Sequence, residues 1–95
     1  LAGGRDDVLI ARWGGEEFLV CQQLPWSTAR ARLEALREGI AQASIDAPDG
    51  DTLQCTVSIG MAELEAGQDL RDLLRVADER LYRAKQQGRN RLVST

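Results

Sequence analysis

The sequence predicts an α+β fold in which an antiparallel sheet is covered by helices, and three observations lead to this class. Two short apolar runs are separated by a Gly-Gly pair, an alternating apolar run lies in the middle of the chain, and two segments carry apolar residues at helical spacing. In chain order these elements read strand, strand, helix, strand, helix. This order is typical of helices packed on one face of a sheet.

The first two strands are expected at residues 8–13 and 17–22, where the chain reads VLIARW and EFLVCQ. Only residues 14–16 separate them, and two of these three are glycines. Because glycine tolerates the positive φ angles that tight turns require, we expect the two strands to form an antiparallel hairpin.

A first helix is expected after Pro25, where residues 27–43 place apolar side chains on one face. Ser27 or Thr28 is able to cap its first turn, since a side-chain hydroxyl accepts a hydrogen bond from a free backbone N–H group. Residues 46–51, DAPDGD, then predict a polar, turn-rich loop. The apolar face of the helix comprises Ala29, Leu33, Leu36, Ile40 and Ala43.

A third strand is expected at residues 53–61, LQCTVSIGM, where larger apolar residues alternate with smaller or polar ones. A second helix is expected to begin at Asp69 and to stop at Gly88, because glycine is common just past the end of a helix. Residues 91–93 fit a short edge strand. The apolar positions of the second helix are Leu70, Leu73, Leu74, Ala77, Leu81 and Ala84.

The composition excludes several classes of protein. A length of 95 residues suits one small domain or a piece of one, and 43% hydrophobic with 28% charged residues is ordinary for a folded domain. The net charge of -3 provides no overall field to attract nucleic acid. No apolar run approaches the roughly 20 residues that span a bilayer. The start, LAGGRDD, has neither an initiator Met nor a signal-peptide pattern, which suggests a piece of a longer protein.

The two cysteines point to a reducing compartment. Cys21 and Cys55 lack the spacing of metal ligands, and the chain has no His, so a zinc site is not expected. Each cysteine falls in an apolar strand pattern, where a reduced and buried thiol is the expected state. We therefore expect a cytoplasmic protein.

The Gly-Gly pair and the two glutamates after it suggest nucleotide chemistry. Because Gly14 and Gly15 have no Cβ, a phosphate group could closely approach their backbone N–H groups. An adjacent carboxylate, Glu16 or Glu17, could then hold the Mg²⁺ that accompanies phosphates. The alternative is a hairpin whose exposed acids serve only solubility, and the spacing alone favours neither interpretation.

A pair of cations lies near the end of the second predicted helix. Lys85 is the only lysine of the chain and precedes Arg89 by four positions, so the two could share a face and bind phosphate if the last helical turn persists. The alternative is structural, because the helix dipole favours cations at a helix C-terminus. On pattern alone this alternative is the stronger one, since Gly88 lies between the two cations.

Three segments of the chain resemble the signature segments of GGDEF domains, the diguanylate cyclases. They are RWGGEEF at residues 12–18, VSIGMA at residues 57–62 and ADERLYRAKQQGRNR at residues 77–91, in the right order and spacing. The resemblance covers essentially all of residues 1–95 and corresponds to the C-terminal part of a single GGDEF domain. It implies a fold similar to the palm of nucleotide cyclases and polymerases, incomplete in this chain.

The resemblance implies a function in bacterial second-messenger signalling: condensation of two GTP molecules into cyclic di-GMP with release of pyrophosphate. The site would form between two domains, so a homodimer is implied, and the parent protein would carry an upstream sensory or receiver domain. Gly14 and Gly15 would form the turn under the phosphates. Glu16 would be the catalytic and metal carboxylate, binding Mg²⁺, and Glu17 would support it.

The same resemblance implies that Lys85 and Arg89 contact the phosphates, which favours phosphate binding over a purely structural role for the pair. The first half of the family's domain carries an aspartate of the metal site, and an Asn and an Asp that read guanine, and these have no counterpart here. We therefore expect residues 1–95 alone to be inactive.

Many relatives also carry an inhibitory product site, Arg-x-x-Asp, nine residues before the first motif glycine. Arg5 holds the arginine position, but Val8 stands where the aspartate is expected and Asp7 is one residue off. A product site at Arg5 would therefore require a local bulge. A solvated cluster of charges at the start of the strand is the preferred interpretation.

Two other classes of function remain open from the sequence. One is a non-catalytic module that binds GTP or cyclic di-GMP, and the other is a fragment that self-associates through an exposed sheet edge. The unaltered GGEEF motif favours the enzyme, because a pure sensor has no need of the motif's carboxylates.

Overall fold

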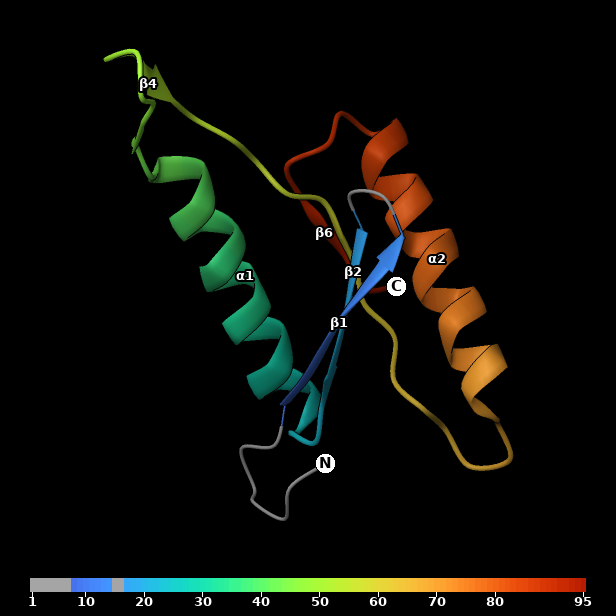
Figure 1. Cartoon of the computed structure of the whole chain (residues 1–95). Coiled ribbons are helices and arrows are strands. Elements are labelled where there is room, and N and C mark those ends of the chain that lie inside the picture. Colours follow the sequence, from blue (N-terminus) through green and yellow to red (C-terminus); the bar gives the residue numbers. More distant parts are fainter. Residues whose placement is uncertain (1–7, 15–16) are drawn as a thin grey trace.

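Two helices of 17 residues each lie on either side of short strand pairs in the computed structural model (Figure 1). The structure describes residues 8–14 and 17–95, with side chains from residue 20 onward. Helix α1 spans Trp26–Gln42 and helix α2 spans Leu70–Gln86. Both helices contact the same short strand near the end of the chain, so the α+β class expected from the sequence is confirmed.

The first strand pair is the expected antiparallel hairpin. Strand β1, Val8–Gly14, pairs with strand β2, Glu17–Gln22. The partners run in regular register as far as Arg12 opposite Phe18, and the next pair is Gly14 opposite Glu17. Strand β1 therefore advances two residues where β2 advances one, which makes Trp13 the extra residue of a β-bulge. Bulges increase the local twist of a hairpin, and this one lies directly beside the turn.

Helix α1 begins one residue earlier than the sequence suggested. Pro25 occupies the N-cap position with φ -54°, no side chain caps the helix, and the Ala29 N–H donates to the Pro25 carbonyl at 2.9 Å. The expectation of a cap at Ser27 or Thr28 is wrong, because the helix begins at Trp26 and both residues therefore lie inside its first turn. Of the expected apolar face, Ala29 is buried, whereas Leu36 is 52% exposed.

The expected strand at residues 53–61 is divided into two pieces. Strand β4, Thr52–Leu53, pairs with strand β3, Ile45–Asp46, around the polar loop that follows α1, and β5 covers only Ile59–Gly60. Residues 54–58 are not assigned to a strand. Alternating apolar residues favour extended backbone, but a strand also needs a hydrogen-bonded neighbour, and none of the described segments pairs with this one.

The division of this strand changes the environment of its cysteine. Cys55 is exposed and Cys21 is half-buried, and both are free thiols. The expectation of two buried cysteines is therefore wrong for Cys55, which lies in the unpaired residues 54–58, and is met only in part for Cys21. Neither of the two cysteines is joined in a disulfide.

Strand β5 pairs with the short strand expected near the end of the chain, and it does so in parallel. Strand β6, Leu92–Val93, lies beside Ile59–Gly60, with the Ile59 N–H donating to the Arg91 carbonyl at 2.9 Å and the Met61 N–H to the Val93 carbonyl at 3.0 Å. The described strands thus form three separate two-stranded pairs, of which two are antiparallel. The single antiparallel sheet expected from the sequence is corrected in this respect.

Asp69 is the N-cap of helix α2, at the position where the sequence predicts the start of this helix. The Asp69 carboxylate accepts from the Asp72 N–H at 3.0 Å, and the Asp72 carboxylate accepts from the Asp69 N–H at 3.2 Å. Such a reciprocal capping box satisfies two backbone donors that helical hydrogen bonding leaves free. Further along, the Arg80 guanidinium donates to the Met61 carbonyl at 2.7 Å and so ties α2 to the end of β5.

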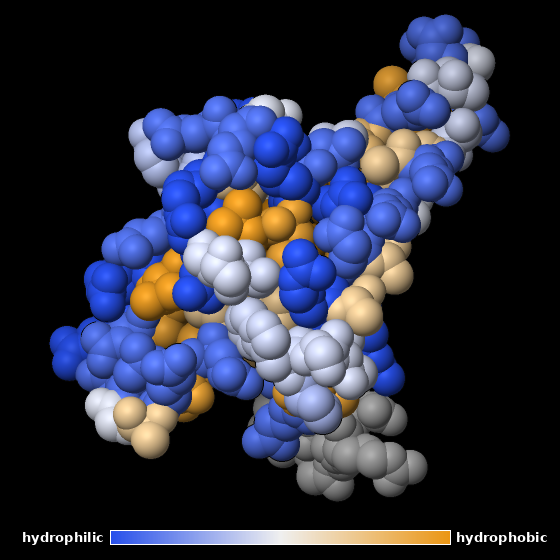
Figure 2. Space-filling model, turned by 180° about the vertical axis from the view of Figure 1, so that it is seen from behind, coloured by the Kyte–Doolittle hydropathy of each residue, from blue (hydrophilic) through white to orange (hydrophobic). Residues whose placement is uncertain are grey.

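The buried core of the described side chains is small, comprising Ala29, Met61 and Ala84. Figure 2 shows apolar atoms, in orange, reaching the surface in the middle of the rear face, bordered by hydrophilic atoms. Large apolar side chains that are exposed include Val20, Leu36, Ile45, Leu53, Leu64, Leu70 and Tyr82. Among the described side chains, more apolar surface remains open to solvent than a small stable domain usually leaves.

Candidate functional site

The hairpin brings Gly14 and Glu17 of the GGEEF motif together. The Cα atoms of Gly14 and Glu17 face each other across the β1–β2 pair, so two residues, Gly15 and Glu16, connect the strands. Those two residues and Arg5 lie outside the described part of the chain. Carboxylate oxygens, which the two glutamates of the motif carry, are hard ligands of the kind that Mg²⁺ prefers. In the rest of the described chain no group of three or more His, Cys, Asp or Glu residues is arranged to hold a metal ion.

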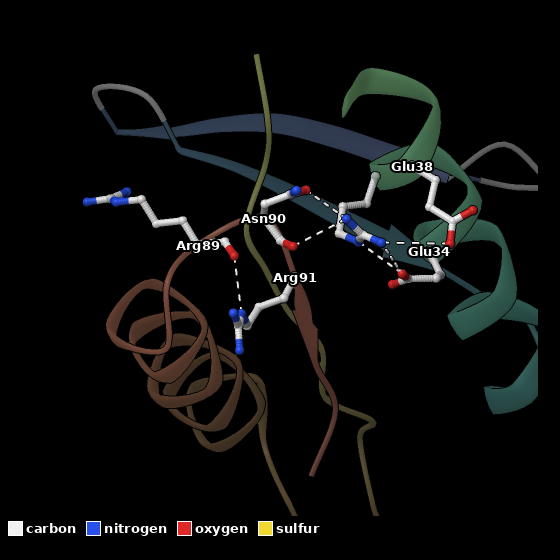
Figure 3. Close-up of polar contacts among 6 residues, drawn as sticks. Glu34, Glu38, Arg89, Asn90 and Arg91 are labelled. Carbon is white, nitrogen blue, oxygen red and sulfur yellow. Dashed lines mark hydrogen bonds and ion pairs between the residues drawn. The ribbon is translucent and has the colours of Figure 1, made fainter. Parts of the chain in front are cut away.

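Lys85 lies in the last turn of α2 and is half-buried. Together with Asp78, Leu81 and Tyr82 it lines a hollow of about 220 Å³ on the side of the helix. In Figure 1 and in Figure 3 the Gly14–Glu17 end of the hairpin is directed to the side of the molecule where α2 ends. The phosphate-binding candidates from the two parts of the sequence therefore share one side of the fold.

Arg89 does not share a helical face with Lys85. Helix α2 ends at Gln86, and three consecutive residues after it have positive φ: Gly88 at 117°, Arg89 at 65° and Asn90 at 49°. The helix thus stops near Gly88 as expected, and the chain turns sharply, leaving Arg89 in an exposed loop. Lys85 thus belongs to the last helical turn and Arg89 to the turn that follows it, so their relative position is set by that turn and not by helical geometry.

Hydrogen bonds from two sides hold this loop, which we call the Arg89 loop and which spans residues 87–91. On the helix side, the Arg89 N–H donates to the Ala84 carbonyl at 2.9 Å, and the Gln87 N–H donates to the Arg83 carbonyl at 2.9 Å. These bonds satisfy carbonyl groups that the end of a helix leaves free. Within the loop, the Arg91 Nε donates to the Arg89 carbonyl at 3.1 Å.

On the other side, the loop is held by Arg37 of helix α1, a residue that the sequence does not single out. Its Nη1 donates to the Asn90 side-chain Oδ1 at 2.7 Å and to the Asn90 carbonyl at 3.2 Å (Figure 3). Its Nε donates to Glu34 Oε1 at 2.9 Å, and its Nη2 lies 3.7 Å from Glu38 Oε1. The Arg37 side chain is only 14% exposed.

The bond between Arg37 and Glu34 shifts the pKa of both residues. The hydrogen bond from Arg37 holds the pKa of the Glu34 carboxyl below its ordinary value, outweighing partial burial, which acts in the opposite direction. The same hydrogen bond raises the pKa of Arg37. In the sequence, Glu34 and Glu38 beside Arg37 are only a weak local signal for an ion pair on a helix. The partner that matters, Asn90, lies 53 positions away and leaves no sequence signal.

Gly60, within the VSIGMA segment, is a second position whose role the sequence does not reveal. A Cβ built on Gly60 would overlap the backbone of Ala77 and Leu81 in α2. The absence of a side chain here lets β5 lie directly against the helix that carries Lys85. A second hollow among the described residues, about 420 Å³ and lined in part by Trp26, Glu63 and Arg80, includes none of the site residues expected from the sequence.

Comparison with known proteins assigns a family to this arrangement. The family model described as diguanylate cyclase, GGDEF domain, matches residues 3–91. Diguanylate cyclase DgcM of Escherichia coli K12 is 40% identical over 87 residues, which are 90% of this chain and 20% of that protein. Diguanylate cyclase DosC of the same strain is 32% identical over 89 residues, which are 93% of this chain and 19% of that protein. The chain thus spans about a fifth of the length of these relatives.

Solved structures show the same fold. The GGDEF domain of DgcB from Caulobacter crescentus, in complex with c-di-GMP, superposes with a TM-score of 0.83 at 30% identity, covering 92% of this chain and 53% of that one. The diguanylate cyclase SiaD from Pseudomonas aeruginosa, in complex with its activator SiaC, gives a TM-score of 0.83 at 32% identity and covers 96% of this chain and 35% of that one. No helix of the described residues is long and apolar enough to cross a membrane.

Proposed function

The chain belongs to the diguanylate cyclase GGDEF family, and from this premise we propose that it is the C-terminal part of one GGDEF domain whose complete protein condenses two GTP molecules into cyclic di-GMP. In each half-reaction the 3′-hydroxyl of one GTP attacks the α-phosphorus of the other, the bond to the β-phosphate breaks and pyrophosphate leaves. The observation that carries this proposal is the β1–β2 hairpin with GGEEF at its turn, where Gly14 lies opposite Glu17.

The turn of the hairpin is the part of the proposed site that holds phosphates and metal. Gly14 and Gly15 would let the triphosphate approach the backbone, because a glycine has no Cβ to keep it at a distance. Glu16 would hold Mg²⁺, with Glu17 in support. When bound, Mg²⁺ would neutralise the negative charge on the phosphoryl oxygens. The bulge at Trp13 supports this assignment, since bulges are common where a strand must redirect residues beside an active site.

The end of helix α2 is the second part of the proposed site. Lys85, from the last turn of α2, and Arg89, from the Arg89 loop, would contact the phosphates of GTP as paired cations. The side chain of Arg89 is exposed and in Figure 3 extends away from Asn90 and Glu34, toward solvent. Positioned cations are the main means by which proteins stabilise phosphoryl transfer.

Since each domain would bind one GTP, catalysis would require two copies of the domain to meet, and we propose a homodimer of the complete protein in the cytoplasm. A further domain that senses a signal or receives a phosphoryl group would control that meeting. The solved relative SiaD, which is bound to an activator, is a precedent for control by a partner. The proposed partners are thus GTP, cyclic di-GMP and a second copy of the domain.

A single substitution tests this proposal in the full-length protein. Glu16→Gln keeps the size of the side chain and removes its charge, so turnover of GTP to cyclic di-GMP in Mg²⁺ should fall at least about a hundredfold, as for loss of one preorganised electrostatic group. Glu79→Gln is the matched control, because Glu79 is exposed on α2 and only pairs with Arg75 at 3.1 Å. Turnover is measured by chromatography of the nucleotide products. Unchanged turnover in Glu16→Gln would refute the proposed role.

A further inference from the structure

We propose that Arg37 is a positioning residue for GTP binding, acting through Asn90 to present Arg89 to the phosphates. This inference rests on the proposed function, because it assigns to Arg89 a role in holding GTP. It adds a residue from helix α1, outside the GGEEF hairpin and outside α2, to the machinery that binds the nucleotide. The argument has three steps, which concern the backbone of the Arg89 loop, its attachment to α1, and the direction of the Arg89 side chain.

The backbone of the Arg89 loop is in a conformation that needs support. Arg89 and Asn90 both have left-handed φ angles, 65° and 49°. Asparagine adopts this region comparatively easily, but an arginine there is uncommon, because its Cβ crowds the following carbonyl oxygen. Such a conformation persists only when the surrounding structure holds it in place.

The attachment to α1 supplies that support from the side opposite the helix end. The Asn90 carbonyl and side-chain oxygen both accept from Arg37 Nη1, at 3.2 and 2.7 Å. The guanidinium is itself held in one orientation by Glu34, to which its Nε donates at 2.9 Å. A planar guanidinium donates to a carboxylate and to an amide oxygen from fixed positions in one plane, whereas the three donors of a lysine ammonium radiate from a single point on a flexible chain.

The direction of the Arg89 side chain follows from this grip. The Arg89 backbone is bonded through its N–H to Ala84 and through its carbonyl to Arg91, and the next residue is held by Arg37. With the backbone held on both sides, the side chain projects away from the cluster, as Figure 3 shows. Holding the loop in advance reduces the ordering that GTP binding would otherwise have to accomplish. Loss of Arg37 should therefore weaken GTP binding without altering the chemical step.

The test compares variants of the full-length protein in three measurements: KM and kcat for GTP turnover, the dissociation constant of a non-reactive GTP analogue, and the thermal midpoint. Arg37→Ala should raise KM and the dissociation constant about tenfold and leave kcat within about twofold, since misplacement of a binding group costs affinity. Arg37→Lys should recover part of the loss. Arg75→Ala is the matched control, because Arg75 forms an exposed ion pair with Glu79 on α2, and its loss should change none of these four quantities.

A double variant separates positioning from general stabilisation. If Arg37 acts through Arg89, then Arg37→Ala should add nothing further to the loss of affinity caused by Arg89→Ala, because residues in one network are not additive. If Arg37→Ala reduces the affinity for the analogue equally in the presence and in the absence of the Arg89 side chain, the proposal is overturned. So does an Arg37→Ala protein whose thermal midpoint falls while its affinity for the analogue is normal.

Two further outcomes are distinguishable. If Arg89→Ala binds the GTP analogue normally, the phosphate role of Arg89 fails and this inference fails with it; if Arg89→Ala binds weakly and Arg37→Ala binds normally, only the inference fails. Should Arg37→Ala not fold, Asn90→Gly carries the test, because glycine keeps the left-handed backbone and removes the Oδ1 acceptor. Asn90→Gly should weaken binding of the GTP analogue about threefold. Normal affinity of that variant for the analogue overturns the proposal.

Discussion

Gly60 and Leu81 lie so close that a Cβ placed on Gly60 would be 2.8 Å from the Leu81 Cα. This contact brings the backbone of β5 against the backbone of α2, the helix that ends in Lys85. Because backbone atoms on both sides cannot move away independently, no side chain fits at position 60. The position of α2, whose last turn carries Lys85, therefore depends on a close contact with β5 that only glycine at position 60 permits.

The first prediction concerns this contact. Gly60→Ala should destabilise the protein by about 1 to 3 kcal/mol, as overpacking of a packed interior does. The matched control is Gly39→Ala in helix α1, where an added Cβ meets nothing within 4 Å. That control should be neutral or stabilising by up to about 1 kcal/mol, because alanine favours helix over glycine. Denaturant unfolding of both variants checks the contrast, and equal effects would contradict the packing argument.

The sequence predicts the hairpin and α2 well because their signals are local. Two glycines at a turn and an aspartate at a helix start act on neighbouring residues, and the structure places the hairpin and the N-cap at Asp69 as expected. The strand expected at residues 53–61 fails because pairing is not local. Its alternation specifies extended backbone, but whether a partner strand lies alongside depends on distant parts of the chain.

The candidate site divides in the same way. The motif residues Gly14, Glu17 and Lys85 could be named from their order and spacing, although the roles of the site residues remain proposals. Arg37 could not be named, because one arginine among the 12 cations of the chain carries no mark of a bond to Asn90. Long-range hydrogen bonds of this kind become visible only once the fold has brought the two residues together.

A second prediction tests the phosphate role of Lys85. In the full-length protein, Lys85→Ala should weaken binding of GTP about tenfold through loss of a charged contact to phosphate. Its thermal midpoint should change little, because a cation at a helix end contributes under about 1 kcal/mol. Calorimetric titration with GTP and a thermal melt measure the two quantities.

Arg71→Ala is the comparison for Lys85→Ala, since it removes a cation from the opposite end of the same helix. The Arg71 side chain is 92% exposed and forms only a loose ion pair with Asp69. Its loss should leave GTP binding unchanged. A Lys85→Ala protein with normal affinity and a large loss of stability would instead favour the helix-dipole role.

A third prediction follows from the lowered pKa of Glu34. A carboxyl whose pKa is lower in the folded state contributes stability that is fully present above its unfolded pKa, near 4.5, and is lost as the pH falls through the lower folded value. The thermal midpoint of the protein should therefore fall between pH 5 and 3 partly through Glu34. Glu34→Gln should show a shallower fall over this window, and Glu79→Gln, a change in an exposed pair, should follow the parent. Identical curves for all three proteins would show that the Arg37–Glu34 bond contributes nothing to folding.

A fourth prediction concerns residues 1–95 as an isolated chain. Of the described side chains only Ala29, Met61 and Ala84 are buried, and small domains have only about 5 to 15 kcal/mol of net stability. We expect this chain by itself to self-associate through its strand edges and exposed apolar side chains. We also expect it to make no cyclic di-GMP. Sedimentation at several concentrations and a GTP turnover assay decide the matter, and a stable monomer with cyclase activity would overturn both expectations.

The bond between Arg37 and Asn90 also has a consequence for synthesis of the protein. The two residues are 53 positions apart, and at 5 to 20 residues per second a ribosome takes about 3 to 10 s to extend the nascent chain from one to the other. During that interval Glu34 and Glu38 are already part of the nascent chain close to Arg37, whereas Asn90 has not yet been added. The local bond between Arg37 and Glu34 can therefore form during translation before the bond to Asn90, which has to wait until the loop that carries Arg89 has been added.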